Sequence, residues 1–411
     1  RWQDAYKVIK ENASDWARAR MALLEKALHA TNAPKKLDKS RAEKLFGSPA
    51  EFSISRLESF AQCGYKHFIQ YGISPADSKF TEVNPIDWGT VFHTAMEMLA
   101  DDVAQSGLDW SALSADEIEK RIDRIYDDLL DEYSHGKLFY TFSNRAAARK
   151  MKRAGTKTAV IAAEHIKKGS FRPVEYEVKF GHNKKYPPLV LSFDKANILL
   201  KGKIDRVDLM EKDGVQYLRI IDYKMGSKDI DITKVVNGLQ IQLFVYIRAA
   251  LNAYPGAVPA GVFYYTLQDG VVTLKSTDDI EKIEQSKLEK AQLKGLFINE
   301  PAIIEGLDPG FESKSTIVPL TKKKDKTVKS KSLVAKEVFE KIIKLALDKA
   351  IEASSRILNG DNPIEPYKFD RTSTSCKYCS YIGICGFDER FSGNSYRKLI
   401  KINLDDMEVG G

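Results

Sequence analysis

The sequence predicts an α/β domain built on a mixed sheet that helices cover, and two observations support this prediction. Segments rich in β-branched residues follow one another between residues 175 and 224, and another such segment occurs at 261–267. Segments with helical spacing lie before, between and after them. Helix, strands, helix and strand within one region are typical of a sheet with helices packed on its faces. The composition agrees, because 43% hydrophobic and 10% aromatic residues are usual for a folded protein.

The first part of the chain, to about residue 168, is predicted to be mainly helical. Residues 2–45 are rich in Ala, Lys, Arg and Leu and predict two or three helices. Because the chain begins with an arginine rather than methionine, we expect residues 1–50 to be a helical extension that ends a preceding domain. A helix is predicted over 52–71, capped by a serine hydroxyl near its start. Apolar residues at 88, 91, 92, 95, 96 and 99 predict an amphipathic helix.

The central and C-terminal parts alternate strands and helices. Four strands are expected at 175–180, 189–193, 198–210 and 215–224, with a turn at Asp213–Gly214 between the last two. A helix over 237–251, a strand at 261–267 and a long helix over 332–358 follow. We expect one domain over 51–390 and a C-terminal tail over 391–411.

Positive charge is concentrated in one segment. Residues 313–349 contain eleven lysines and four acidic residues, which accounts for the whole net charge of +7. A localised basic segment suits a phosphate backbone, and we expect contacts to DNA from Lys322, Lys323, Lys324 and Lys326. A solvated charged loop is the alternative interpretation. Apolar runs are too short for a membrane span, so no membrane association is expected.

Two carboxylates and a lysine on neighbouring predicted strands form a candidate catalytic centre. Residues two apart on a strand share a face, so Asp222 and Lys224 point to one side, and Tyr223 offers its carbonyl at the edge of the site. Asp205 lies on the preceding strand, where antiparallel pairing would place it opposite Asp222. Oxygen ligands of this kind suit Mg²⁺, with Mn²⁺ or Ca²⁺ as substitutes. Lys224 would orient the attacking water or stabilise charge in the transition state.

Structural interpretations of these short motifs stay open. Asp-x-Lys is common at strand ends, Asp205 and Arg206 would also fit a surface ion pair, and Glu175 is expected to be a solvent-facing charge outside the site. The helix predicted over 237–251 supports the catalytic interpretation of these motifs, because Gln242 and Tyr246 lie one turn apart beside its apolar stripe. There they would hold the lysine, a water molecule or DNA.

Four cysteines suggest a second metal centre. Three of them, Cys376, Cys379 and Cys385, lie within ten residues, and Cys63 lies more than three hundred residues upstream. This uneven spacing is unlike the disulfide framework of a small secreted domain and fits thiolates in a reducing cytoplasm. Spacing alone leaves Zn²⁺ and an iron–sulfur cluster open.

The order of motifs resembles the RecB-like branch of the PD-(D/E)xK superfamily. Gly202-Lys-Ile-Asp-Arg-Val-Asp208 is similar to G-x-I-D-R-x-D, Ile221-Asp-Tyr-Lys224 contains D-Y-K, and Gln242-Leu-Phe-Val-Tyr246 is similar to Q-x-x-x-Y. The resemblance implies a restriction-endonuclease-like mixed sheet, metal ligation by Asp205, Asp222 and His93, and a catalytic Lys224. Without it, His93 would more often be a packed or exposed side chain.

The cysteine pattern narrows the resemblance further. A lone cysteine in Ser53-Ile-Ser-Arg-Leu-Glu-Ser-Phe-Ala-Gln-Cys63, followed by this core and C-x2-C-x5-C, resembles the AddB family of bacterial helicase–nuclease subunits. Ser380 stands where proline is expected in that motif. The resemblance implies a 4Fe–4S cluster joining both ends of the domain, an AddA-type helicase subunit as partner, and DNA strands fed from a broken duplex end.

Three alternatives remain at this point. The chain would also fit a free-standing iron–sulfur exonuclease of the type found in CRISPR adaptation, a catalytically silent DNA-binding module, or a zinc protein. No G-x-x-x-x-G-K-[ST] loop occurs, so an ATP-driven activity is not expected from this chain itself.

Overall fold

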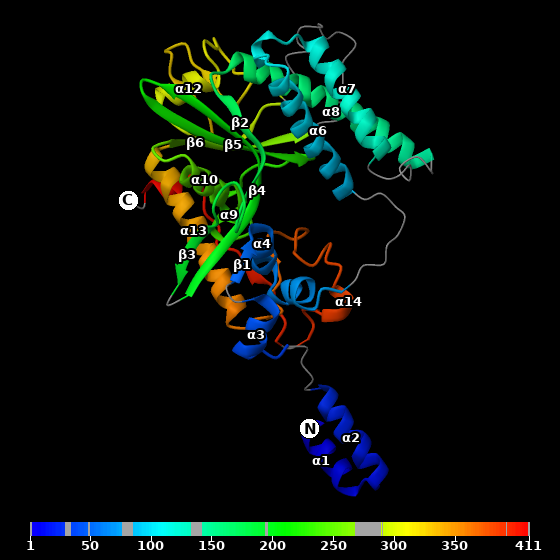
Figure 1. Cartoon of the computed structure of the whole chain (residues 1–411). Coiled ribbons are helices and arrows are strands. Elements are labelled where there is room, and N and C mark those ends of the chain that lie inside the picture. Colours follow the sequence, from blue (N-terminus) through cyan, green and yellow to red (C-terminus); the bar gives the residue numbers. More distant parts are fainter. Residues whose placement is uncertain are drawn as a thin grey trace, which may run out of the picture.

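The computed structural model of the chain has a mixed sheet at its centre (Figure 1). It describes residues 2–28, 34–47, 50–75, 85–132, 142–193, 196–267, 289, 291–391 and 393–409. The strands are β1 (Ala50–Ser53), β2 (Arg172–Phe180), β3 (Leu189–Phe193), β4 (Ala196–Lys212), β5 (Val215–Met225), β6 (Val258–Leu267), β7 (Lys294–Ile298), β8 (Thr321–Lys322), β9 (Val328–Lys329), β10 (Leu333–Val334), β11 (Tyr367–Lys368) and β12 (Arg397–Lys398).

The helices precede, interrupt and follow these strands. They are α1 (Trp2–Asn12), α2 (Asp15–Leu28), α3 (Lys39–Phe46), α4 (Ile54–Gln62), α5 (Gly64–His67), α6 (Pro85–Gln105), α7 (Ala115–Glu132), α8 (Phe142–Lys168), α9 (Ile232–Val236), α10 (Gln242–Ala253), α12 (Pro301–Leu307), α13 (Lys336–Leu358), α14 (Ile382–Cys385) and α15 (Leu404–Val409), with a π-helix at Phe68–Ile73 and a 3-10 turn at Trp110–Ala112. Among the described residues, none of these helices combines the length and apolarity needed to cross a bilayer.

The predicted mixed sheet is confirmed. Its strand order is β1-β4-β5-β6-β7-β10, with β2 and β3 also paired to the long β4. β4 and β5 are antiparallel, whereas β5 and β6 are parallel. Asp213 and Gly214, with φ of 52° and 75°, form the tight turn between β4 and β5, as their sequence predicts.

Side chains alternate between the two faces of the sheet, and helices cover both. On one face Tyr223 packs edge-on against Phe92 of α6, and the Tyr265 hydroxyl donates to a backbone carbonyl of α8. On the other face Phe180 packs against Tyr246 of α10, which in turn lies against α13. Figure 1 shows these two groups of helices on opposite sides of the sheet. The two layers enclose the core, so β5 and β6 are buried along most of their length.

The N-terminal helices differ in how they pack. α3 lies against α13, with Ala42 and Phe46 buried in the core. Figure 1 shows α1 and α2 packed on each other, apart from the sheet. The division of the chain at residue 50 stays a prediction.

Three predicted helix boundaries are wrong, each for a local reason. The helix expected over 52–71 breaks at Cys63, whose extended backbone (φ −170°) separates α4 from α5. Ser53 occupies the N-cap without a side-chain hydrogen bond to the helix. The helix expected from residue 237 begins at Gln242, because Gly238 adopts a positive φ in a turn after α9. The long helix α13 begins at Lys336 instead of Ser332, because Leu333–Val334 pairs with β7 as β10.

A buried charge network lies at the middle of β4 and β5. Asp208 accepts hydrogen bonds from Arg206 (2.6 and 2.8 Å) and from Arg219 across the ladder (2.9 Å). All three side chains are at most 3% exposed, so the interpretation of Arg206 as part of a surface ion pair is wrong. Burial raises the pKa of Asp208, but the two guanidinium groups outweigh it and lower the pKa. The network ties β4 to β5.

Asp208→Asn should lower the free energy of unfolding by about 3 kcal/mol or more, because it leaves two buried guanidinium groups without a counter-charge. Urea unfolding measures this loss. Glu211→Gln, at an exposed position on the same strand, is the matched control and should change stability by less than about 0.5 kcal/mol. Equal effects of the two variants would show that the network does not stabilise the β4–β5 pair.

Candidate metal centre

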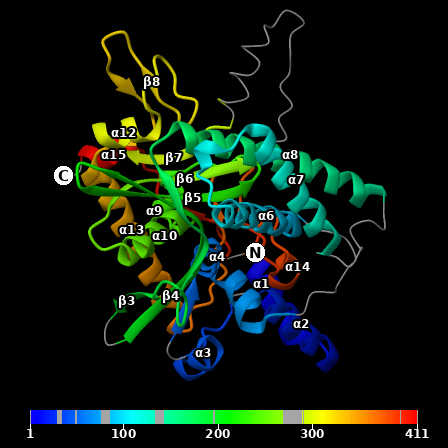
Figure 2. The same cartoon turned by 45° about the horizontal axis from the view of Figure 1, so that its top comes forward.

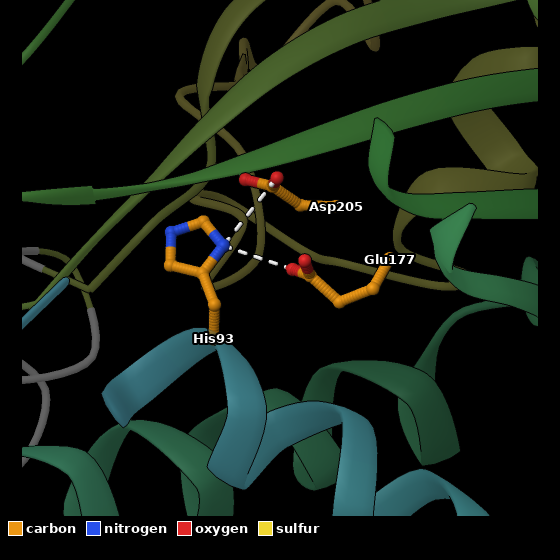
Figure 3. A group of neighbouring side chains, drawn as sticks. All are labelled: His93, Glu177 and Asp205. Atoms are coloured by element: carbon orange, nitrogen blue, oxygen red, sulfur yellow. Dashed lines mark hydrogen bonds and ion pairs between the residues drawn. The ribbon is translucent and has the colours of Figure 1, made fainter. Parts of the chain in front are cut away.

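Three side chains from different elements of the domain meet in one group (Figure 3). His93 of α6 lies with its Nδ1 atom 2.9 Å from Glu177 Oε1 of β2 and 3.4 Å from Asp205 Oδ1 of β4. Their ligand atoms all lie within 4.8 Å of one another, the only such group of three or more His, Cys, Asp or Glu found in the described part of the chain. An imidazole and two carboxylates at this separation are a donor set for a divalent cation.

Asp222 and Lys224 adjoin this group through the β4–β5 ladder. Arg206 pairs with Ile221, so the next positions along the two strands bring Asp205 beside Asp222, as the antiparallel prediction required. Asp205 Oδ2 accepts a hydrogen bond from the Tyr223 backbone N–H (2.7 Å). The Lys224 ammonium lies 2.5 Å from Asp222 Oδ2.

Asp222 is the least satisfied of these groups. It is 1% exposed and, its ion pair with Lys224 aside, neither carboxylate oxygen has a hydrogen-bond partner among the described residues. Burial, followed by the negative charge of Asp205, raises its pKa to about 6, although Lys224 opposes the shift. A buried carboxylate with so few donors is costly unless a cation accompanies it, so this observation fits a metal ligand.

The pKa of His93 also reflects its two carboxylate neighbours. Burial lowers this pKa, but hydrogen bonds and charge from Asp205 and Glu177 prevail and raise it to about 10. The two carboxylates thus favour positive charge beside them, which a divalent cation would also supply.

Glu177 is the member of the site that sequence reasoning missed. It is buried, forms an ion pair with Lys203 and has a φ of 47°. A positive φ is a strained conformation for glutamate, and such strain is often found at functional sites. Glu175, the carboxylate considered from the sequence, instead pairs with Lys185 at 2.6 Å, outside the group.

A family comparison identifies this arrangement. Residues 51–386 match the model of the PD-(D/E)XK nuclease superfamily. The chain belongs to the PD-(D/E)XK nuclease superfamily. Its fold class is thereby confirmed, and the assignment of Asp205, Asp222 and Lys224 to the superfamily motif stays a prediction.

Curated relatives are similar over nearly the whole chain. The chain is 32% identical to the B-type subunit of the ATP-dependent helicase/deoxyribonuclease of Clostridium acetobutylicum, over 96% of its length and 35% of that protein. The corresponding protein of Clostridium botulinum is 34% identical over 97% of this chain, again 35% of the relative. The corresponding protein of Caldanaerobacter subterraneus is 33% identical over 97% of this chain and 35% of the relative. The chain thus spans about a third of the length of these relatives.

Helix α10 borders the PD-(D/E)XK site. Tyr246 is buried against Phe180, and burial raises its pKa while a hydrogen bond with Gln242 opposes the shift. The start of α10 is held by Glu58 of α4, which accepts from the backbone N–H of Ile241 (2.8 Å) and Gln242 (3.0 Å). Burial raises the pKa of Glu58 to about 7. Glu58, which belongs to the Ser53–Cys63 sequence motif, therefore connects this motif to the candidate site.

The four cysteines converge, although they come from distant parts of the chain. Cys63, Cys376, Cys379 and Cys385 line one small pocket, and none forms a disulfide. Burial raises the pKa of Cys63, and burial with the charges of the other three thiols raises that of Cys376 to about 11. Such thiols would need a metal to become thiolates at neutral pH.

The four lysines predicted to contact DNA lie on a surface hairpin. Lys322 is at the end of β8, and Lys323, Lys324 and Lys326 follow in the exposed turn before β9. Figure 2 shows this hairpin, in yellow, projecting from the body beside α12. Contact of these residues with DNA stays a prediction.

In metal-free buffer Asp222→Asn should stabilise the chain at neutral pH. Because its folded pKa of about 6 lies above the ordinary 3.8, ionised Asp222 costs stability as pH rises between these values. The variant should gain on the order of 2 kcal/mol at pH 7 and almost nothing at pH 4. Thermal unfolding in EDTA at both pH values measures the difference.

Mg²⁺ supplies the second half of this test. It should raise the unfolding temperature of the wild type and have little effect on Asp222→Asn, because a cation that binds only the folded chain stabilises it. A variant less stable than the wild type at pH 7 would show that the ion pair with Lys224 outweighs the cost of burial.

Proposed function

We propose that this chain hydrolyses DNA phosphodiesters as the metal-dependent nuclease domain of a helicase/deoxyribonuclease subunit. The observation that supports this most directly is the group of His93, Glu177 and Asp205 beside the buried, unsatisfied Asp222 and its lysine. The alternative of a silent DNA-binding module has less support, because each acid and the lysine expected for catalysis are present and adjacent.

The residues of the site suit a divalent cation such as Mg²⁺. His93, Glu177, Asp205 and Asp222 would hold it, and the carbonyl of Tyr223 remains a predicted fifth ligand. When bound, the cation would polarise the phosphate and lower the pKa of a bound water. Lys224, held by Asp222, would orient that water or stabilise the charge that develops on the phosphate. Gln242 and Tyr246 would position Lys224 or the strand.

The relatives support the wider assignment. Their name describes one subunit, the B type, of an ATP-dependent helicase/deoxyribonuclease. We infer that residues 51–390 form the nuclease domain of such an AddB-type subunit, with an AddA-type subunit as partner and a cytoplasmic location. The partner would supply the strand from a broken duplex end. Lys322, Lys323, Lys324 and Lys326 would bind the DNA backbone along its path.

The cysteines would hold a 4Fe–4S cluster rather than a single zinc ion. Tetrahedral ligation at a Zn–S distance of about 2.3 Å requires sulfur atoms about 3.8 Å apart. Within the described residues, no three cysteine sulfurs lie within 4.8 Å of one another, which favours a larger centre. The cluster would join Cys63 to the C-terminal trio and close a loop of more than three hundred residues, which stabilises the fold by restricting the unfolded chain.

The nuclease assignment predicts Mg²⁺-dependent degradation of end-labelled single-stranded DNA. Lys224→Ala and Glu177→Gln should each lower the rate by at least roughly 100-fold, because each removes a group that acts on the reacting phosphate or its metal. Glu175→Gln, two residues away on the same strand and paired with Lys185, is the matched control and should retain the wild-type rate. Wild-type rates in Lys224→Ala would refute the site, and DNA binding without cleavage by the wild type would favour the silent module.

Cys379→Ser should lower iron content and thermal stability together. Loss of one thiolate opens the cross-link between the two ends of the domain, so the unfolding temperature should fall by several degrees. Iron and zinc analysis of protein purified without oxygen, followed by calorimetry, tests this. Zinc in place of iron would replace the cluster assignment, and unchanged stability would refute the cross-link.

A further inference from the structure

A second lysine lies close to the catalytic face, in the loop between β5 and α9. The ammonium of Lys228 lies over the ring of Tyr264, 4.6 Å from its centroid. Tyr264 pairs with Asp222 in the parallel β5–β6 ladder, and paired residues of neighbouring strands project to the same face. Lys228 therefore presents its charge on the face of the sheet that carries Asp222 and Lys224.

A buried glutamine fixes the loop that carries Lys228. Gln240 is 6% exposed, and its Nε2 donates to the Asp229 carbonyl (2.8 Å) and to the Tyr264 hydroxyl (3.3 Å). Its Oε1 accepts from the Asp231 backbone N–H (2.9 Å). The Gln240 side chain thus links the Asp229 and Asp231 backbone, which follows Lys228 in the loop, to the Tyr264 ring over which Lys228 lies. The position of the ammonium is set by buried hydrogen bonds rather than by a chance loop conformation.

The ammonium of Lys228 keeps its hydrogen-bonding capacity. No hydrogen bond or ion pair joins it to another residue in the described parts of the chain, and the ring that it lies over there is that of Tyr264. Burial and then the charge of Lys224 lower its pKa, while Asp222 and Glu58 oppose that shift. The half-buried ammonium has three N–H donors and lies beside a second lysine. Two neighbouring positive charges suit an anion whose oxygens accept hydrogen bonds, and phosphate is an anion of this kind.

We propose that Lys228 binds a phosphate of the nucleic acid strand in the site, and that Gln240 positions it. The proposal rests on the proposed function, since the strand must enter the site. Lys224 acts at the reacting phosphate, and Lys228 holds the strand beside it. Gln240 touches no substrate and acts through the loop and Tyr264.

The test compares Lys228→Ala, Lys228→Arg and Lys44→Ala in Mg²⁺-dependent cleavage of a labelled oligothymidylate. Lys228→Ala should raise KM roughly tenfold with a smaller change in kcat, because a charge-assisted hydrogen bond to substrate is lost. The salt dependence of kcat/KM should become shallower by about 0.7 in log–log slope, the value of one phosphate contact to a single strand. Lys228→Arg should recover most of the affinity, and Lys44→Ala, on the exposed surface of α3, is the control.

Binding in EDTA, followed by fluorescence anisotropy, distinguishes failure of this inference from failure of the proposed function. If the wild type neither binds nor cleaves the oligonucleotide, the proposed function fails and this inference fails with it. If the wild type binds and Lys228→Ala matches it in affinity and salt slope, the inference alone is overturned.

The role of Gln240 is tested by a double-mutant cycle. Gln240→Ala should raise KM in the wild-type background and have little further effect in Lys228→Ala, because both changes remove the same contact. If Gln240→Ala lowers the unfolding temperature, Gln240→Glu replaces it in the cycle. This variant keeps the side-chain oxygen that accepts from Asp231 and loses the N–H groups that donate to Asp229 and Tyr264. Additive effects of the two substitutions would refute a positioning role.

Discussion

The antiparallel register of β4 and β5 is the constraint on which the site depends. It brings Asp205 beside Asp222 and sets Lys224 on the same face as Asp222. Because side chains alternate along a strand, a slip of one residue would send one carboxylate to the opposite face and separate the candidate metal ligands. Two features prevent this slip: the tight turn after β4, and the buried Asp208, which accepts hydrogen bonds from an arginine on each strand.

Helix α4 connects the site to the cysteines. Glu58 accepts two backbone hydrogen bonds at the start of α10, which carries Gln242 and Tyr246 beside the site. One turn later the same helix ends at Cys63, whose extended backbone places it in the pocket with the other three cysteines. Loss of the metal centre that we propose there would loosen α4, and with it the start of α10. The proposed centre would in this way influence the proposed catalysis without touching the substrate.

The site also joins groups whose charges oppose one another. Asp222 is buried with a raised pKa, two carboxylates raise the pKa of His93, and Lys224 lies against Asp222. Burial of Asp222 beside the negative charge of Asp205 is unfavourable in the metal-free chain, and a divalent cation would relieve this cost. The positive φ of Glu177 is a further local cost accepted at the same place. Together these features distinguish a binding site from an ordinary surface cluster.

The sequence by itself determined the mixed α/β fold, the β4–β5 hairpin and the proximity of Asp205, Asp222 and Lys224. It could do so because period-two patterns and tight turns are local properties of the chain. The partnership of His93 with these residues came only from a family resemblance. Tertiary structure alone placed Glu177 in the candidate site: alternation treats Glu175 and Glu177 alike, but Glu177, which has a positive φ, contacts His93, whereas Glu175 pairs with Lys185. Sequence patterns likewise could not predict that Asp208 is buried or that Gln240 donates a hydrogen bond to the loop of Lys228. Both features depend on contacts between segments that meet only in the folded chain.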